Sequence, residues 1–486
     1  MLPLEDTLSR HEVRLFPSIH ISSGREAELR ATASLLAMAK AVSEFGRAVV
    51  AMAGGPRGRL DCYTEIPINT PEPDDAEIRP DGLLVVRRGK KEWKAFVEVK
   101  VGDAPLKQDQ LDAYHRQAGV EGVDAVVTIS NQTALPNGLP PLTIDKRRLR
   151  RVTVTHISWE RLLSEARLLS NRKDIDDPDQ HWMLEEWIKY LADPLSQIID
   201  PPDLGQHWST ILKSAKMGAL EAESKNLEDV VAHWDSFERK LAFRLRAKLG
   251  VDVQPVLSRA DKAEPAVRLK RLHREALQTR SLVSVLRIPD AAGDVTVTVL
   301  LAGKAVRYSI SMKAPTQGRV KTRLSWLARQ LKGATMPPEA SIAVRWDHRG
   351  LHSFASAAAI VKEPAVLLRA PDGNPIPQGA MPRTFDIEST VGLVRGRGRS
   401  TAPVLEGVAV GLERFYRDVI EHLRAYVPPA PKLSGQSKEN DALHAQPEEP
   451  SHAAPAGANP QGGDNTSTTP LPQGSDLASI RTRGQS

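Results

Sequence analysis

The feature that most constrains this fold is a pair of apolar runs separated by a short polar turn. Residues 83–86 and 94–100 have the composition of strands, and the polar residues 87–91 between them predict an antiparallel hairpin. Pairing of the two runs brings Asp81, at the start of the first strand, close to Glu98, near the end of the second. The sequence therefore predicts that two carboxylates meet at one end of this hairpin.

The side-chain directions along the second run add a lysine to these carboxylates. Successive side chains of a strand point to opposite faces, so Glu98 and Lys100 share one face while Val97 and Val99 point into a core. Carboxylate and carbonyl oxygens together form a site that suits Mg²⁺. A metal there polarises a phosphodiester and activates water, and the lysine orients that water or holds the phosphate.

These residues resemble the signature of the PD-(D/E)xK nuclease superfamily: Pro80-Asp81, a strand-length gap, and then Glu98-Val99-Lys100. The resemblance implies that Asp81 and Glu98 bind Mg²⁺, for which Mn²⁺ can substitute, and that the Val99 carbonyl is a further ligand. It also implies that Lys100 is the catalytic lysine. A hairpin stabilised by a cross-strand ion pair is the structural alternative, because an Asp followed at a distance by Glu-x-Lys is common in charged chains.

Two flanking helices contribute supporting residues. Apolar residues recur at helical spacing over residues 24–50, with Glu28 on the inward stripe. The resemblance implies that Glu28 assists at the metal site; a favourable interaction with the helix dipole is an equal alternative. A second helix, residues 105–118, carries Gln110 and Tyr114 one turn apart. The pair is similar to the QxxxY element of the RecB-like exonuclease branch. This resemblance implies that Gln110 and Tyr114 contact the substrate or support the active site. The alternative is a solvated Gln above a half-buried Tyr.

The order of expected elements matches the αβββαβ core of that superfamily: helix 24–50, strand 60–68, the hairpin, helix 105–118 and strand 124–130. Strand 152–157 and helix 158–169 follow it. We therefore expect an α/β protein whose residues 1–170 have a restriction-endonuclease-like fold. The resemblance extends over roughly residues 20–165 and leaves the remainder of the chain unaddressed.

The remainder of the chain divides by pattern into three regions. Residues 171–265 are expected to be a helical linker region, residues 266–427 an α+β domain of unknown role, and residues 428–486 a disordered tail rich in Pro, Gly and Ser. The clearest helix spans residues 226–249. Its basic face is expected to be solvated rather than bound to nucleic acid, and it consists of Arg239, Lys240, Arg244, Arg246 and Lys248.

Charge and cysteine content limit the partners and the compartment. The chain has 66 Lys and Arg against 60 Asp and Glu, a net charge of +6 that favours polyanionic partners. The densest basic cluster offers phosphate contacts, although a solvated loop is an equal interpretation: Lys146, Arg147, Arg148, Arg150 and Arg151. The single cysteine, Cys62, excludes an internal disulfide and is expected in a core. We expect a cytoplasmic protein with no membrane partner, because no long apolar run or export signal is present.

Two functions are consistent with these observations. The first is a Mg²⁺-dependent deoxyribonuclease in which Asp81 and Glu98 hold the metal and Lys100 assists the attacking water. The alternative is a catalytically inactive, nuclease-like adaptor that binds nucleic acid, or a protein through its second domain or tail, in a stress or defence response. The sequence does not show whether the substrate is DNA or RNA, or whether cleavage starts at chain ends or within the strand. It also leaves the oligomeric state open.

Overall fold

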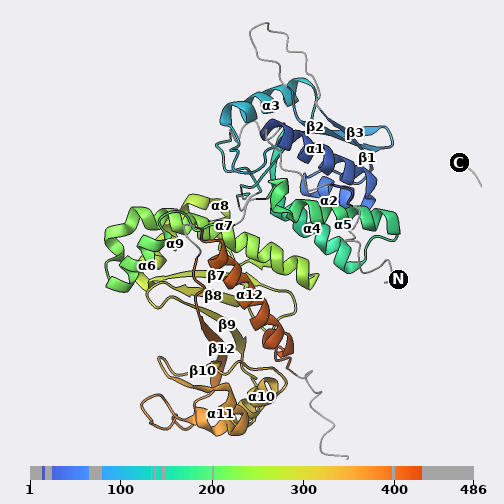
Figure 1. Ribbon diagram of the computed structural model, residues 1–486. Helices are drawn as coiled ribbons and strands as arrows, with labels where there is room; N and C mark the ends of the chain where they lie inside the picture. The colour runs from blue at the N-terminus through green and yellow to red at the C-terminus, as the bar shows by residue number, and fades with distance from the viewer. Residues whose placement is uncertain are drawn as a thin grey trace, which may run out of the picture. The chain divides into compact units, whose positions relative to one another are not determined.

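The computed structural model describes residues 14–16, 24–64, 79–132, 134–135, 138–144, 149, 151–199, 202–396 and 400–428. It is a mixed α/β structure with two sheets (Figure 1). The expected tail, from residue 429 onward, lies outside the described residues. No helix in the described ranges is long and apolar enough to cross a membrane.

The first sheet contains five strands in the order β1-β2-β3-β4-β5. β1 pairs with β2 and β2 with β3 in antiparallel fashion, whereas β3, β4 and β5 are parallel. The strands are β1 (Arg59–Thr64), β2 (Gly82–Arg88), β3 (Lys91–Val99), β4 (Ala125–Ser130) and β5 (Thr153–Ser158). The predicted hairpin is confirmed as β2 and β3, with a tighter turn at Gly89, where a positive φ of 62° suits glycine.

Helices cover both faces of this sheet (Figure 1). One face packs against α1 (Gly24–Ala41), α2 (Ser43–Met52), α4 (Trp159–Arg172) and α5 (Pro178–Ala192). The other face packs against α3 (Gln108–Val120), which contributes Leu111, Tyr114 and Ala118 to a smaller core. All six residues of β4 are buried, as expected for a strand covered on both sides.

Two helix predictions in this region need correction. The single helix expected over residues 24–50 is two helices, because the backbone is extended at Val42, with φ −100° and ψ 101°. Gly46 permits the resulting close contact: a Cβ atom there would lie 2.0 Å from the carbonyl oxygen of Ala39. The second helix begins at Gln108 rather than at Pro105. Strand β1 is seen as far as Thr64, and the remaining predicted residues, 65–68, lie outside the described part of the chain.

The second sheet has seven strands in the order β11-β10-β12-β9-β8-β7-β6, and every pairing in it is antiparallel. The strands are β6 (Gln254–Pro255), β7 (Ser281–Arg287), β8 (Val295–Leu300), β9 (Ala305–Lys313), β10 (Ser341–Trp346), β11 (His352–Ser356) and β12 (Pro382–Gly392). The neighbouring strands β8 and β9 form an antiparallel hairpin.

One face of the second sheet forms a core with helices that precede it, follow it or lie between its strands in the chain. These helices are α6 (Trp208–Met217), α7 (Ser224–Leu249), α9 (Pro265–Thr279), α10 (Val320–Lys332), α11 (Ala357–Lys362) and α12 (Ala402–Asp418), and the short α8 (Arg259–Ala263) precedes α9. Residues 171–265 are largely helical, and their helices contribute to both cores. Their helix α5 belongs to the first core, and α6 and α7 belong to the second.

The basic face of α7 is not the solvated surface that we expected. Arg246 lies 2.7 Å from Glu165 of α4, and Arg244 contacts Glu406 and Glu413 of α12, each pair with N–O distances of 2.6 Å. The aliphatic part of an arginine or lysine side chain packs well between helices when acidic residues on the neighbouring helix pair with its charged group. Arg244 and Arg246 thus join α7 to α12 and α4.

Candidate active site at the end of strand β3

The hairpin register places Asp81 beside Glu98. Gly82 pairs with Val97, so the residue before Gly82 comes level with the residue after Val97. The backbone N–H of Val99 donates to Oδ2 of Asp81 at 2.7 Å, which fixes the aspartate against the end of β3. The two carboxylates predicted to meet do lie together.

Glu98 is a buried carboxylate with only 3% of its surface exposed. Burial, followed by the nearby charge of Asp81, raises its pKa to about 7, because these effects exceed the opposing attraction of Lys100. Nζ of Lys100 lies 2.7 Å from Oε1 of Glu98. Functional sites are common places for carboxylates whose pKa is raised in this way.

Lys100 also contacts the first helix. Its Nζ lies 3.2 Å from Oε2 of Glu28 on α1, so the ammonium group stands between two glutamates. Burial alone would lower the pKa of Lys100, but the charges of Glu98 and Glu28 outweigh it and raise the pKa above its ordinary value. Lys100 is therefore held as a cation, and Glu28 is part of the cluster rather than only an N-terminal acid of α1.

Gln110 and Tyr114 connect α3 to the same cluster. Nε2 of Gln110 donates to the hydroxyl of Tyr114 at 3.1 Å, and that hydroxyl donates to the carbonyl oxygen of Arg79 at 3.1 Å. Tyr114 is buried, and burial together with the charge of Glu98 raises its pKa. The pair thereby anchors the backbone two residues before Asp81 and borders Glu98.

Trp159 supports the end of β3, although no sequence motif pointed to it. Its indole Nε1–H donates to the carbonyl oxygen of Lys100 at 2.8 Å, and its ring is fully buried. Ser158 ends β5 and caps α4 by accepting a hydrogen bond from the backbone N–H of Arg161 at 3.3 Å, which places Trp159 at the first position of the helix. In the sequence, the position of Trp159 directly after strand β5 and the capping Ser158 is the pattern that could have indicated this buried role.

The donor atoms at this position are those that a divalent cation prefers. Neither Oε1 nor Oε2 of Glu98 makes a hydrogen bond of regular geometry within the described residues, although Lys100 is close by. A buried carboxylate with spare acceptor capacity fits a hard metal ion. Among the described residues there is no group of three or more His, Cys, Asp or Glu side chains that could hold a metal. Asp81 and Glu98 are the two carboxylates that the structure brings together at this position.

The other sequence candidates are only partly described. Lys146, Arg147, Arg148 and Arg150 lie outside the described residues, and Arg151 is exposed. Cys62 is half-buried in β1, where burial raises the pKa of its thiol to about 11, so it is a poor nucleophile.

Comparison with known proteins adds no assignment. No protein-family model matches the chain, and no curated protein matches its sequence.

Proposed function

We propose that this protein is a Mg²⁺-dependent nuclease that hydrolyses phosphodiester bonds of DNA, with a restriction-endonuclease-like αβββαβ core in its first region. The observation that carries the proposal is the convergence of Asp81, Glu98, Lys100 and Glu28 at the end of β3. Three separate segments of the sequence supply these residues, so a simple cross-strand ion pair does not account for them. The choice of DNA rests on the resemblance to PD-(D/E)xK nucleases.

The roles of the residues follow from their chemistry. Asp81, Glu98 and the Val99 carbonyl would hold Mg²⁺, which supplies Lewis-acid polarisation of the phosphodiester. Lys100 would orient the attacking water or hold a phosphate oxygen as a point charge. Glu28 keeps the ammonium group of Lys100 in position, and Tyr114 fixes the chain before Asp81.

Cleavage of labelled single- and double-stranded DNA tests the proposal, with Mg²⁺, Mn²⁺ or a chelator present. We expect Asp81→Asn and Lys100→Ala each to lower the rate by at least about 100-fold. Asp109→Asn on α3 and Lys91→Ala on β3 are matched controls, because both side chains are exposed. Cleavage that persists in the chelator or in both site variants would contradict the assignment.

Metal binding can be measured without activity. A ligand that binds only the folded state raises the melting temperature, so Mg²⁺ should stabilise the wild type and fail to stabilise Asp81→Asn. Equal stabilisation of both proteins would place the ion elsewhere. DNA binding that ignores both Mg²⁺ and the Asp81→Asn change would instead favour the inactive adaptor.

A further inference from the structure

The positive charge of this protein is concentrated in one stretch that lies outside the β3 cluster. Residues 313–338 contain six Lys and Arg residues and no Asp or Glu. The whole chain has a net charge of +6, so this stretch alone carries an excess as large as that of the entire protein. It consists of the last residue of β9, a turn, helix α10 and the segment after that helix (Figure 1).

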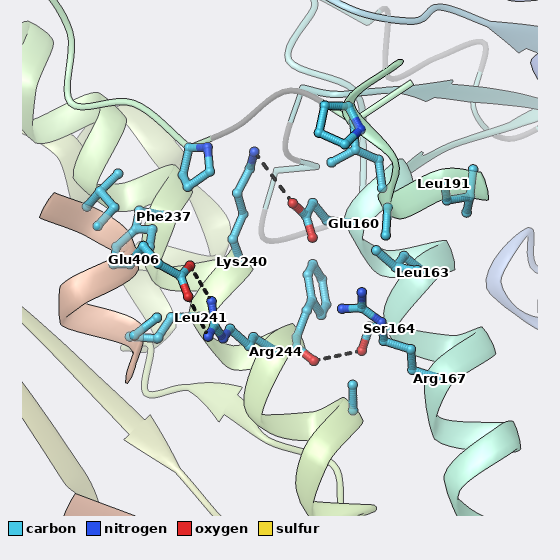
Figure 2. Close-up of a pocket in the computed structure, with 18 of the residues that line it drawn as sticks. Glu160, Leu163, Ser164, Arg167, Leu191, Phe237, Lys240, Leu241, Arg244 and Glu406 are labelled. Carbon is cyan, nitrogen blue, oxygen red and sulfur yellow. Dashed lines mark hydrogen bonds and ion pairs between the residues drawn. The ribbon is translucent and has the colours of Figure 1, made fainter. Parts of the chain in front are cut away.

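Several cations elsewhere in the second region are neutralised by acidic partners. Figure 2 shows Arg244 of α7 beside Glu406 of α12, to whose two carboxylate oxygens it donates hydrogen bonds of 2.6 and 2.9 Å. Arg345 of β10 similarly lies 2.6 Å from Asp386 of β12. The carboxylate beside each of these arginines leaves little attraction for an anion from outside the protein.

The exposed cations of α10 lack such partners. The side chains of Lys321, Arg329 and Lys332 form no ion pair or hydrogen bond with any residue that the structure describes. Arg329 and Lys332 follow Lys321 by eight and eleven positions, which places all three near one side of the helix. With Ser325 between them they form an exposed row about 16 Å long, which we call the α10 stripe.

The surroundings of the α10 stripe do not cancel its charge. Arg323 donates to two backbone carbonyl oxygens of the preceding turn, at 3.1 and 2.6 Å, and these neutral acceptors leave its charge in place. The segment after α12 lies against α10, since the backbone N–H of Arg424 donates to Oε1 of Gln330 at 2.9 Å. That segment, residues 419–428, contains one acid, Glu421, and one permanent cation, Arg424, so it adds no net negative charge.

The apolar residues of α10 limit the class of partner. The three leucines that give the helix its apolar side are buried in the second core: Leu324, Leu327 and Leu331. Trp326 packs against Phe385 and Tyr426, with ring centroids 6.3 and 6.2 Å apart. A helix that binds a membrane surface inserts its apolar side, and α10 has none to spare.

The exposed surface of this stretch also lacks the anchors of a protein interface. No large apolar side chain of residues 313–338 is exposed, whereas the energy of protein interfaces is concentrated in buried aromatic and apolar anchors. A row of unpaired cations without an apolar component instead matches a polyanion whose charge repeats along its length. The phosphate backbone of a nucleic acid has this property.

We propose that the α10 stripe binds the phosphate backbone of duplex DNA. Lysine and arginine contacts to phosphates do not depend on base sequence, and they displace bound counterions, so the affinity falls as the salt concentration rises. The choice of DNA rests on the proposed nuclease function. The stripe supplies grip on the substrate that is separate from the β3 cluster.

Fluorescence anisotropy of the full chain with a labelled DNA duplex tests this proposal. A chelator is present, so that metal-dependent cleavage does not occur, and the affinity is measured at several salt concentrations. Each phosphate contact contributes about 0.9 to the slope of log affinity against log salt concentration. The double variant Lys321→Gln, Arg329→Gln should therefore reduce this slope by about 1.8 and weaken binding at low salt about tenfold.

A second double variant, Arg287→Gln, Arg345→Gln, is the matched control. It removes the same charge from two exposed arginines of the second sheet, but these already pair with Asp294 and Asp386. The control should change the slope by less than about 0.5. Equal effects of the two double variants would show that only net charge matters and would overturn the proposal, as would the absence of saturable DNA binding.

Melting curves show whether each variant is folded. If the double variant of the stripe does not fold, Lys321→Gln alone decides the matter, with an expected decrease in slope of about 0.9. An RNA duplex of the same sequence and phosphatidylserine vesicles serve as competitors. Tighter binding of either competitor than of DNA, with the same dependence on the stripe, would overturn the choice of DNA.

Mg²⁺-dependent cleavage is measured separately, so that the two proposals can fail independently. Cleavage by a protein whose salt slope does not respond to the stripe variants would overturn the DNA-binding proposal alone. A slope that depends on the stripe, in a protein that does not cleave DNA, would support DNA binding and contradict only the nuclease proposal.

Discussion

Ionisation of Glu98 carries a cost to folding stability. Burial and the neighbouring Asp81 raise its pKa from 4.5 to about 7, which corresponds to about 3 kcal/mol of free energy when the group is ionised. A residue placed at such a cost, with two oxygens that lack regular hydrogen bonds, is better explained by chemistry than by stability.

The variant Glu98→Gln should therefore be more stable than the wild type in the absence of metal, by about 1–3 kcal/mol at pH 8. The folded wild type binds the Glu98 proton more tightly than the unfolded chain, so its stability falls as pH rises from about 4.5 to about 7. The advantage of the variant should accordingly be small at pH 4.5 and complete above pH 7. Urea unfolding at several pH values measures it.

Glu26→Gln serves as the control for this measurement. Glu26 is an exposed acid of α1 that pairs with Arg30 four residues away, and exposed pairs of this kind contribute little to stability. Its loss should change the free energy of unfolding by less than about 0.5 kcal/mol at every pH. A Glu98→Gln protein that is less stable than the wild type at pH 8 would show that the carboxylate is a structural partner of Lys100.

At the scale of elements, the contact between α1 and α2 depends on one glycine. A Cβ atom at Gly46 would lie 2.0 Å from a backbone oxygen of α1, so Gly46→Ala should destabilise the protein by about 2 kcal/mol or more. Gly119→Ala in α3 is the matched comparison, because its Cβ would meet nothing closer than 4.0 Å. Alanine there should increase stability by about 0.5–1 kcal/mol, as measured by denaturant unfolding. Equal effects of the two changes would contradict this account of the α1–α2 contact.

The attachment of α9 to α7 rests on a buried arginine. Arg268 is 3% exposed and makes hydrogen bonds to Asp235 and Glu238 of α7. Arg268→Met would leave the buried Glu238 without its ion-pair partner, while Asp235 would keep its contact with Arg239. We expect a loss of about 3–5 kcal/mol in thermal or urea unfolding. Lys270→Met, on the exposed face of the same helix, should change stability by less than about 0.5 kcal/mol.

At the scale of the molecule, the two hydrophobic cores are linked through α4 and α7. Ser164 donates to the carbonyl oxygen of Phe243 at 2.9 Å, and Asn171 donates to that of Ala247 at 2.7 Å. With Arg246 and Glu165, these contacts join helices from different cores. Cooperative unfolding of the described residues therefore depends on this helix pair.

The double variant Ser164→Ala, Asn171→Ala should reduce that cooperativity. Each lost hydrogen bond is worth about 0.5–1.5 kcal/mol, so the ratio of van't Hoff to calorimetric enthalpy should fall or two transitions should separate in scanning calorimetry. Ser170→Ala is the control, since Ser170 of the same helix bonds to Glu185 within the first core. An unchanged ratio would mean that the two cores unfold together for another reason.

Local patterns in the sequence were enough to predict most helices and strands of the first region and the faces on which its candidate site residues lie. Alternation along residues 94–100 placed Glu98 and Lys100 on one face, and helical spacing put Gln110 and Tyr114 one turn apart, because side-chain direction follows from backbone periodicity alone. The mixed α/β class with a β2–β3 hairpin followed from the same local patterns.

Contacts between residues far apart in the chain depend on how the helices and sheets pack. The contact of Glu28 with Lys100, the Trp159 hydrogen bond to the end of β3 and the acidic partners of the α7 cations join residues far apart in the chain. The break at Val42 likewise comes from packing between helices. Periodicity fixes the face on which a side chain lies, but the element that covers that face depends on long-range packing that no local pattern encodes.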